Sequence, residues 1–190
     1  MTALSSPVIK FLDDYTLKHA CEEDAYQLAR VVDLNRKYLR KWLPWLDTSN
    51  NAQDSLVYIQ KSHSDWMKHR VFYGLIYKKN EIIGAMGFHH NVHKYMALGY
   101  WISEEHSKGG ICTAASQALL KWAFAYFKDL NLIELRAATE NLASRRVAEK
   151  LGFKKEGILR QREWLYDHFV DHVVYSLTRT EFNAPKSPTS

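Results

Sequence analysis

The passage from Tyr95 to Thr139 constrains the fold more than any other part of the chain. "YMALGYWI" reads as a strand that stops at the polar turn "SEEHSKGG", and "LIELRAAT" reads as a later strand. Between them a helix is expected over Thr113–Phe127, with an apolar stripe made of Leu119, Leu120, Ala123, Phe124 and Phe127. A strand, helix, strand passage of this length predicts a right-handed crossover and two locally parallel strands.

The other strand signals come in antiparallel pairs. "VFYGLIYK" and "IIGAMGFHH" flank the turn "KNE", and the segment "FKKEGILRQREWLYDHFVDHVVYSLTR" reads as two strands around "YDH". A short strand is expected at Thr16–His19, and helices at "CEEDAYQLARVV" and over Ala52–His69. The sequence therefore predicts an α/β (α+β) fold: a central mixed, mostly antiparallel sheet of about seven strands flanked by helices. We expect one domain over residues 1–182 and a flexible tail over 183–190.

Composition excludes several functional classes. No apolar run approaches the ~20 residues of a membrane span, and the start lacks the pattern of a secretory signal, so a cytoplasmic protein with no membrane role is expected. The net charge of +5 suits an anionic partner, but the basic residues are scattered, which argues against a direct nucleic-acid role. Cys21 and Cys112 are expected as reduced thiols. "HHNVHK", His89–Lys94, reads as a solvated turn, and no metal site is expected.

The paired glycines Gly109 and Gly110 mark a candidate anion site. Where a strand passes into a helix through such a turn, unpaired backbone N–H groups lie at the positive end of the helix dipole. Lys108 adds charge, and Thr113 could cap the helix or bond a phosphate oxygen. The alternative is that the glycines only make a tight connection. Neither G-x-x-x-x-G-K-[ST] nor G-x-G-x-x-G occurs, which disfavours ATP and NAD.

Several segments resemble the Gcn5-related N-acetyltransferases (GNAT superfamily), in the RimJ/RimL branch of ribosomal-protein N-terminal acetyltransferases. "ATENLASRRVAEKLGFKKEGILRQREWLYDHFVDHVVYSL" is similar to that branch's signature, and "LRKWLPW" to its substrate-side segment. The family's Q/R-x-x-G-x-G/A loop corresponds to Ser107–Cys112; Gly110 matches, whereas Ser107 and Cys112 depart from the pattern. The resemblance covers Leu17 to Leu177 and implies an enzyme that uses acetyl-CoA.

The resemblance also implies a cofactor site. The pyrophosphate would lie on the glycine turn, and the pantetheine arm between strand edges at Trp101–Ser103 and Ala137–Thr139. The implied cofactor-binding residues are Trp101, Ile102, Ser103, Ser107, Lys108, Gly109, Gly110, Ile111, Cys112, Thr113, Asn141 and Arg145. Asn141 is equally well explained as a helix cap, and Arg145 as part of a solvated helix face.

Two residues would carry the chemistry by resemblance. Ser144 corresponds to the serine that donates a proton or hydrogen bond to the departing coenzyme A thiolate. Ala148 stands where many members of the superfamily have a tyrosine acid, which favours Ser144 in that role. Glu163 corresponds to the general base, although a strand glutamate beside Arg162 is also typical of a surface ion pair. Direct attack in a ternary complex is expected.

The expected acceptor is an amine held near Trp42, Trp45 and Glu163, although the two tryptophans could instead belong to the core. At pH 7 an α-amine is roughly 10% neutral and a lysine amine about 0.04%, so a weak base suffices for a protein N-terminus. We therefore expect the N-terminal amine of a ribosomal protein. A polyamine, an antibiotic or an aminoacyl toxin remains an alternative acceptor, and a non-catalytic acyl-CoA sensor an alternative of another class. The sequence leaves a homodimer open.

Overall fold

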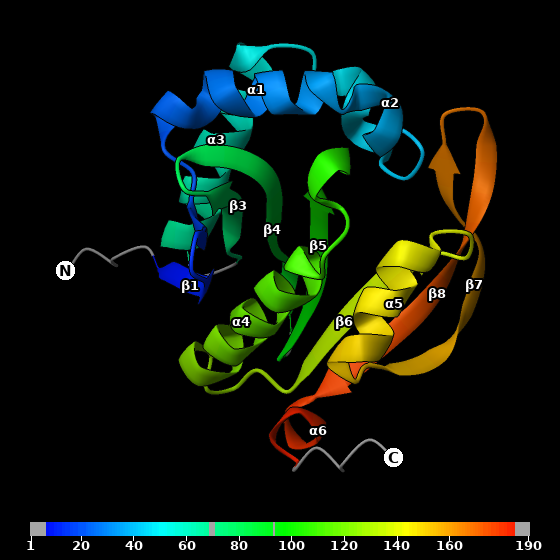
Figure 1. Cartoon of the computed structure of the whole chain (residues 1–190). Coiled ribbons are helices and arrows are strands. Elements are labelled where there is room, and N and C mark those ends of the chain that lie inside the picture. Colours follow the sequence, from blue (N-terminus) through cyan, green and yellow to red (C-terminus); the bar gives the residue numbers. More distant parts are fainter. Residues whose placement is uncertain (1–6, 69–70, 93, 185–190) are drawn as a thin grey trace.

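The computed structural model describes residues 7–68, 71–92 and 94–184, apart from the side chains of residues 90–92. All its strands belong to one eight-stranded sheet, in the order β1-β2-β3-β4-β5-β6-β8-β7 (Figure 1). The strands are β1 Val8–Leu12, β2 Tyr15–His19, β3 Tyr73–Lys78, β4 Glu81–Val92, β5 Tyr95–Ile102, β6 Leu132–Ala138, β7 Lys154–Leu165 and β8 His168–Thr178. The helices are α1 Ala25–Leu34, α2 Arg36–Leu39, α3 Ala52–Met67, α4 Ile111–Tyr126, α5 Leu142–Leu151 and α6 Arg179–Asn183, with short 3-10 turns η1 Glu22–Asp24, η2 Pro44–Thr48 and η3 Glu104–His106.

The strand pairing confirms the mixed sheet. β5 and β6 are parallel, joined through α4, and every other neighbouring pair in the sheet is antiparallel. β8 inserts between β6 and β7, so the last two strands form a hairpin at one end of the sheet. The class of the sheet was therefore predicted correctly from the sequence.

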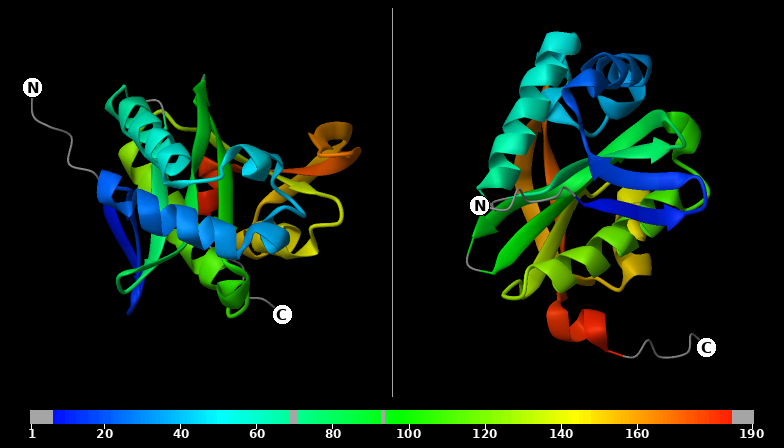
Figure 2. Two further views of the ribbon diagram at one scale, coloured as in Figure 1. Left: turned by 90° about the horizontal axis from the view of Figure 1, so that it is seen from above. Right: turned by 90° about the vertical axis from the view of Figure 1, so that its left-hand side faces the viewer.

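Helices cover both faces of the sheet, as Figure 2 shows for α1 and α3 on one side and α4 on the other. Each face has its own hydrophobic core. Leu119, Leu120 and Ala123 of α4 are fully buried in one core, together with alternate residues of the central strands. Leu28 and Val32 of α1 and Ile59 of α3 pack in the other. The period-3.6 stripes of the helices thus meet the period-2 faces of the strands.

β5 and β6 separate at one end, and this separation positions the site. Their register runs from Tyr95 opposite Leu132 to Leu98 opposite Leu135 and ends there. Beyond it, β5 continues in its ladder with β4, and β6 in its ladder with β8. The two strands consequently diverge like the arms of a V in Figure 1, between α4 and α5.

Several boundaries differ from the sequence expectations. β1 was not expected. The expected strand "IIGAMGFHH" extends two residues further, so Asn91 and Val92 belong to β4 rather than to a turn, because their backbone continues the ladder with β5. α4 begins at Ile111 rather than Thr113, since Gly110 ends the turn in a left-handed conformation. His69, the expected end of α3, lies outside the described residues, as do 185–190 of the expected tail, whereas Asn183 ends α6.

Candidate active site

The glycine turn leads directly into α4. Gly109 and Gly110 have φ angles of +83° and +78°, which side-chain-bearing residues rarely adopt. The first hydrogen bond within α4 runs from Ala114 N–H to Gly110 O at 2.9 Å, so the N–H groups of residues 111–113 precede the helical ladder. Both glycines are exposed, and no atom lies within 4 Å of a Cβ built on either. The turn therefore presents amides and open space where the sequence predicts a pyrophosphate.

The residues next to the glycine turn make different contacts. The Ser107 hydroxyl donates to Glu104 O at 2.7 Å and so closes η3, and Ile111 belongs to the core beneath α4. Lys108 is exposed, and Thr113 is half-buried in the first turn of the helix, which has no side-chain cap. Cofactor contacts by these residues remain predictions.

Cys112 is not poised for nucleophilic attack. Burial raises the pKa of its thiol to about 12, so the thiol keeps its proton near neutral pH. The protonated thiol favours direct attack over an acyl-cysteine intermediate.

The strand edges predicted for pantetheine border the gap between β5 and β6. Trp101 and Ile102 end β5, and Ala137 and Ala138 end β6. Ser103 N–H donates to Ile83 O at 2.8 Å, which prolongs the β4 ladder and directs that amide away from the gap. Both edges lack a partner strand over this stretch of the described sheet, and such unpaired edges are where an extended ligand can add as a strand.

The first turn of α5 faces the same gap. Asn141 is the N-cap, and its side-chain oxygen accepts the N–H of Ser144 at 3.1 Å, so the capping interpretation is confirmed. Arg145 donates from Nη1 to Thr139 O at 2.7 Å and from Nε to the Tyr175 hydroxyl at 3.3 Å. These bonds fasten α5 to the residue that follows β6 and to β8, whereas Arg146 and Lys150 are exposed.

One cavity of about 1090 Å³ joins the two faces of the sheet through this gap. Tyr100, Asn141 and Ser144 line it on the α4–α5 side. Trp101, Glu163 and His172 line it on the opposite side, where the helices α1 and α3 lie. The catalytic pair predicted from the sequence, Ser144 and Glu163, is thus brought to one continuous space.

Glu163 owes its position to an irregularity of β7. The pairing of β7 with β8 shifts between Leu159 and Glu163, Gln161 has a φ of +48°, and its N–H donates to an Asp171 carboxylate oxygen at 2.8 Å. Such a bulge redirects the side chains that follow it. Oε2 of Glu163 lies 3.4 Å from Nε2 of His172, whose side chain is only 13% exposed. A half-buried carboxylate beside an imidazole can accept a proton from an amine in the cavity.

The segment from Trp42 to Ser49 forms the wall above Glu163. Trp42, Leu43 and Trp45 are half-buried and line the cavity, whereas Leu46 is fully buried in the core. From the sequence, Trp42 and Trp45 could belong to the core or to a pocket wall. In the structure both line the cavity, and Trp45 also packs against the core. The rings of Trp45 and Trp101 lie 6.5 Å apart between centroids.

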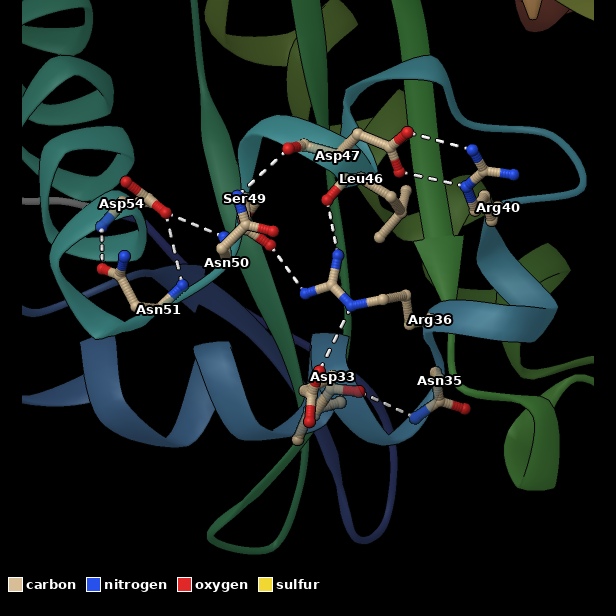
Figure 3. Close-up of polar contacts among 11 residues, drawn as sticks. Asp33, Asn35, Arg36, Arg40, Leu46, Asp47, Ser49, Asn50, Asn51 and Asp54 are labelled. Atoms are coloured by element: carbon tan, nitrogen blue, oxygen red, sulfur yellow. Dashed lines mark hydrogen bonds and ion pairs between the residues drawn. The ribbon is translucent and has the colours of Figure 1, made fainter. Parts of the chain in front are cut away.

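Two arginines hold this wall in place (Figure 3). The Arg36 guanidinium donates to the backbone oxygens of Leu46 and Ser49. Arg40 makes a two-point contact with Asp47 at 3.0 and 2.9 Å and lies 3.6 Å above the ring of Tyr166. Tyr166 in turn donates its hydroxyl to Leu43 O at 2.5 Å, which ties the β7–β8 turn to the wall.

Sequence reasoning missed Tyr100 and His172. Tyr100 shares the core face of β5 with Met96 and Leu98, and its hydroxyl lies 3.0 Å from Ser144 Oγ. A tyrosine at an apolar position of a strand needs a partner for its hydroxyl, which is the signal that could have found it. His172 had no comparable signal, because its contact with Glu163 depends on the register of β8.

Among the described residues, no group of three or more His, Cys, Asp or Glu side chains is arranged to hold a metal ion. The segment His89–Lys94, for which the sequence raised the possibility of a metal site, includes residues 90–93, whose side chains are outside the described part of the structure. None of the described helices combines the length and apolar character needed to cross a bilayer.

Comparison with known proteins agrees with this geometry. The family model described as "Acetyltransferase (GNAT) domain" matches residues 15–154. A putative ribosomal N-acetyltransferase, YdaF of Bacillus subtilis (strain 168), is 31% identical over 93% of this chain and 98% of its own length. The ribosomal-protein-serine acetyltransferase of Escherichia coli (strain K12) is 28% identical over 88% of this chain and 94% of its own. Among solved structures, a RimL ribosomal L7/L12 alpha-N-protein acetyltransferase in complex with coenzyme A superimposes with a TM-score of 0.87, at 24% identity, over 92% of this chain and 99% of that one. This chain belongs to the GNAT acetyltransferase family.

Proposed function

We propose that this acetyltransferase transfers the acetyl group of acetyl-CoA to the N-terminal α-amine of a protein, with a ribosomal protein as the acceptor. The observation that carries the proposal is the single cavity that crosses the sheet between β5 and β6, with Ser144 on one face and Glu163 on the other. Such a passage lets donor and acceptor meet from opposite faces. The names of the relatives YdaF and the E. coli ribosomal-protein-serine acetyltransferase favour the ribosomal acceptor, which would place the reaction in the cytoplasm.

The cofactor would bind along the α4–α5 face. Its pyrophosphate would lie on the N–H groups of residues 111–113 at the Gly109–Gly110 turn, and its pantetheine arm between the diverging strands. A backbone amide on the β5 edge would polarise the thioester carbonyl and stabilise the oxyanion that develops there. The exposed Lys108, just before α4, and the exposed Arg146, in the first half of α5, supply positive charge that would meet the phosphates, whereas Lys150 lies in the last turn of α5.

The acceptor would enter between the Trp42–Ser49 wall and the β7–β8 hairpin. The neutral amine nitrogen attacks the thioester carbon, forming the C–N bond, and Glu163 takes the proton that the amine loses, directly or through a water molecule. The C–S bond then breaks, the electron pair stays on sulfur, and Ser144 donates a hydrogen bond or a proton to the thiolate. His172, at 3.4 Å from Glu163, would orient the carboxylate.

The test measures thiol release from acetyl-CoA. The acceptors are a lysine-free peptide with a free N-terminus, the same peptide with its N-terminus blocked, a blocked lysine peptide, polyamines, antibiotics and an aminoacyl nucleotide analogue. We expect release with the free N-terminus and loss on blocking. Glu163→Gln should lower kcat about 10²-fold near pH 7, with a smaller deficit above pH ~8, where the amine loses its proton unaided.

Glu81→Gln is the matched control, because Glu81 is exposed at the start of β4 and does not line the cavity. It should leave kcat unchanged. Thiol release with a small amine but with none of the peptides would show that the acceptor is a small amine rather than a protein N-terminus. Tight coenzyme A binding without turnover on any acceptor would make the chain an acyl-CoA sensor instead.

A further inference from the structure

The hydroxyl of Tyr100 makes its contacts at Ser144. Tyr100 reaches from the core face of β5 toward the first turn of α5. Its hydroxyl oxygen lies 3.0 Å from Ser144 Oγ, a contact in which either oxygen can donate, and 3.3 Å from Ser144 O, to which the phenol can donate instead, so the contact with Oγ is the shorter of the two. The ring packs against the core beneath α4, so the hydroxyl is held in place from below. Both side chains line the cavity that crosses the sheet. A second hydroxyl therefore stands beside the one assigned to the thiolate.

The backbone of this turn is fixed independently of Tyr100. The Asn141 side chain accepts the N–H of Ser144 at 3.1 Å, which sets the position of the Ser144 Cα and Cβ atoms. The serine hydroxyl can still rotate, since a hydroxyl both donates one proton and accepts through two lone pairs. What remains to be decided is where the Ser144 proton points.

We propose that Tyr100 is a positioning residue that donates its hydroxyl proton to Ser144 Oγ, so that Ser144 directs its own proton to the sulfur of coenzyme A. This inference rests on the role given to Ser144 in the proposed function. When the C–S bond breaks, sulfur keeps the electron pair, and the chain Tyr100 O–H to Ser144 O–H to sulfur stabilises the thiolate. Hydrogen bonds in such a chain polarise and strengthen one another. Tyr100 loses no proton.

The surroundings of Tyr100 suit a permanent donor. Burial raises the pKa of its phenol well above the ordinary value, the Cys112 thiol adds to this rise, and the hydrogen bond with Ser144 offsets only part of it, so the hydroxyl stays protonated across the working range of pH. The sequence also lacks a hydroxyl at Ala148, which is fully buried one turn further along α5. In this chain a tyrosine hydroxyl reaches the turn from β5 instead.

The test is the pKa of the coenzyme A thiol bound to the full chain, which needs no acceptor. Thiolate absorbance is titrated with pH for the complex, and the titration of the free protein is subtracted to remove its cysteines and tyrosines. Four proteins are compared: wild type, Tyr100→Phe, Ser144→Ala and the double variant. We expect Tyr100→Phe to raise the bound thiol pKa by about one unit, because without the phenol the Ser144 proton is no longer directed to sulfur and part of its hydrogen bond to the charged thiolate is lost. In the Ser144→Ala background the same change should have no further effect.

Tyr77→Phe is the matched control, because it removes a buried tyrosine hydroxyl that donates to Asp24 at 2.6 Å, away from the cavity. It should leave the thiol pKa at the wild-type value. The inference is overturned if Tyr100→Phe titrates like wild type, or if its shift persists in full without the Ser144 hydroxyl, which would indicate packing. If Ser144→Ala itself causes no shift, the role of Ser144 in the proposed function fails as well, whereas a wrong acceptor leaves all these titrations unchanged.

With the acceptor in hand, kinetics give an independent check. Tyr100→Phe should lower kcat about tenfold while the KM for acetyl-CoA stays within about twofold, because the hydroxyl acts on the departing sulfur rather than on the bound thioester. A rise in KM with an unchanged kcat would contradict the inference.

Discussion

Gly110 and Gly152 both adopt the left-handed backbone conformation, but they lie in different surroundings. Their φ angles are +78° and +88°, and at both sites a Cβ would meet no protein atom within 4 Å. Gly152 ends α5, where its N–H donates to Glu149 O at 3.1 Å. Gly110 instead opens α4 at the proposed pyrophosphate site. A side chain at either position should therefore strain the backbone equally, but only a side chain at position 110 should also meet the ligand.

Gly110→Ala should cost about 1–2 kcal/mol of stability through the left-handed conformation, and Gly152→Ala a similar amount. Only Gly110→Ala should weaken coenzyme A binding, by roughly tenfold, because the new methyl group occupies the space of the phosphate and displaces the amides. Thermal unfolding and titration calorimetry measure the two effects. Equal coenzyme A affinity in the two variants would refute a phosphate site at this turn.

At the scale of elements, the wall over the acceptor side is held by side chains rather than by regular structure. The η2 turn is only Pro44–Thr48, and Arg36 from α2 binds Leu46 O within this turn and Ser49 O directly after it. Tyr166, in the turn between β7 and β8, holds the other end through Leu43 O. Glu163 lies three residues before Tyr166, so the contact of Tyr166 with Leu43 holds the wall close to the proposed base.

Arg36→Lys should loosen this wall without unfolding the sheet. A single ammonium group cannot reach Leu46 O, Ser49 O and Asp33 together, so about 2 kcal/mol of hydrogen bonding to charge is expected to be lost. Amide hydrogen exchange should accelerate in residues 43–49, and the KM for the acceptor should rise more than that for acetyl-CoA.

Arg30→Lys, an exposed substitution of the same kind on α1, serves as the control and should leave exchange in that segment unchanged. Unaltered exchange in Arg36→Lys would mean that packing of Leu46 alone holds the wall.

On the scale of the whole molecule, β2 carries a buried histidine whose charge matters to stability. His19 is 5% exposed and packs against Trp66 and Phe72 at ring distances of 5.3 and 4.8 Å. Neither ring nitrogen has a hydrogen-bond partner among the described residues. Burial, and to a lesser extent the neighbouring His63, lowers the pKa of His19 from 6.5 to about 4.

The sign of the pH effect follows from this lowered pKa. Between pH 6.5 and about pH 4 the unfolded chain binds a proton at His19 that the folded chain does not, so stability falls as the pH falls through this window. The loss attributable to His19 should reach roughly 3 kcal/mol at its lower end. His19→Leu should flatten this part of the profile, as measured by urea unfolding at pH 7.5 and pH 5.

His168→Leu, at an exposed histidine in the turn region of the β7–β8 hairpin, should keep the wild-type difference between the two pH values. If His19→Leu keeps it as well, another group governs the acid sensitivity of the fold.

Local signals in the sequence predicted the central elements well. The stripe in α4, the hairpin of β3 and β4 and the last two strands depend on residues close in sequence, so their periodicity was readable. β1 escaped notice because "VIKFL" is short and does not alternate between apolar and polar residues, although at the edge of the sheet its residues alternate between exposed and half-buried positions. The resemblance of the Ala138–Leu177 segment, rather than any pattern of spacing, pointed to Ser144 and Glu163.

The sequence by itself determined the mixed sheet, the parallel crossover through α4 and the glycine turn, because each is encoded within one helix, strand or connection. Only the tertiary structure decided that Ser144 and Glu163 line one cavity, that His172 meets Glu163, and that Tyr100 meets Ser144. These encounters depend on where the pairing of β5 with β6 ends and on the bulge in β7. Such features arise from the packing of distant segments against one another, and no local pattern of residue types specifies them.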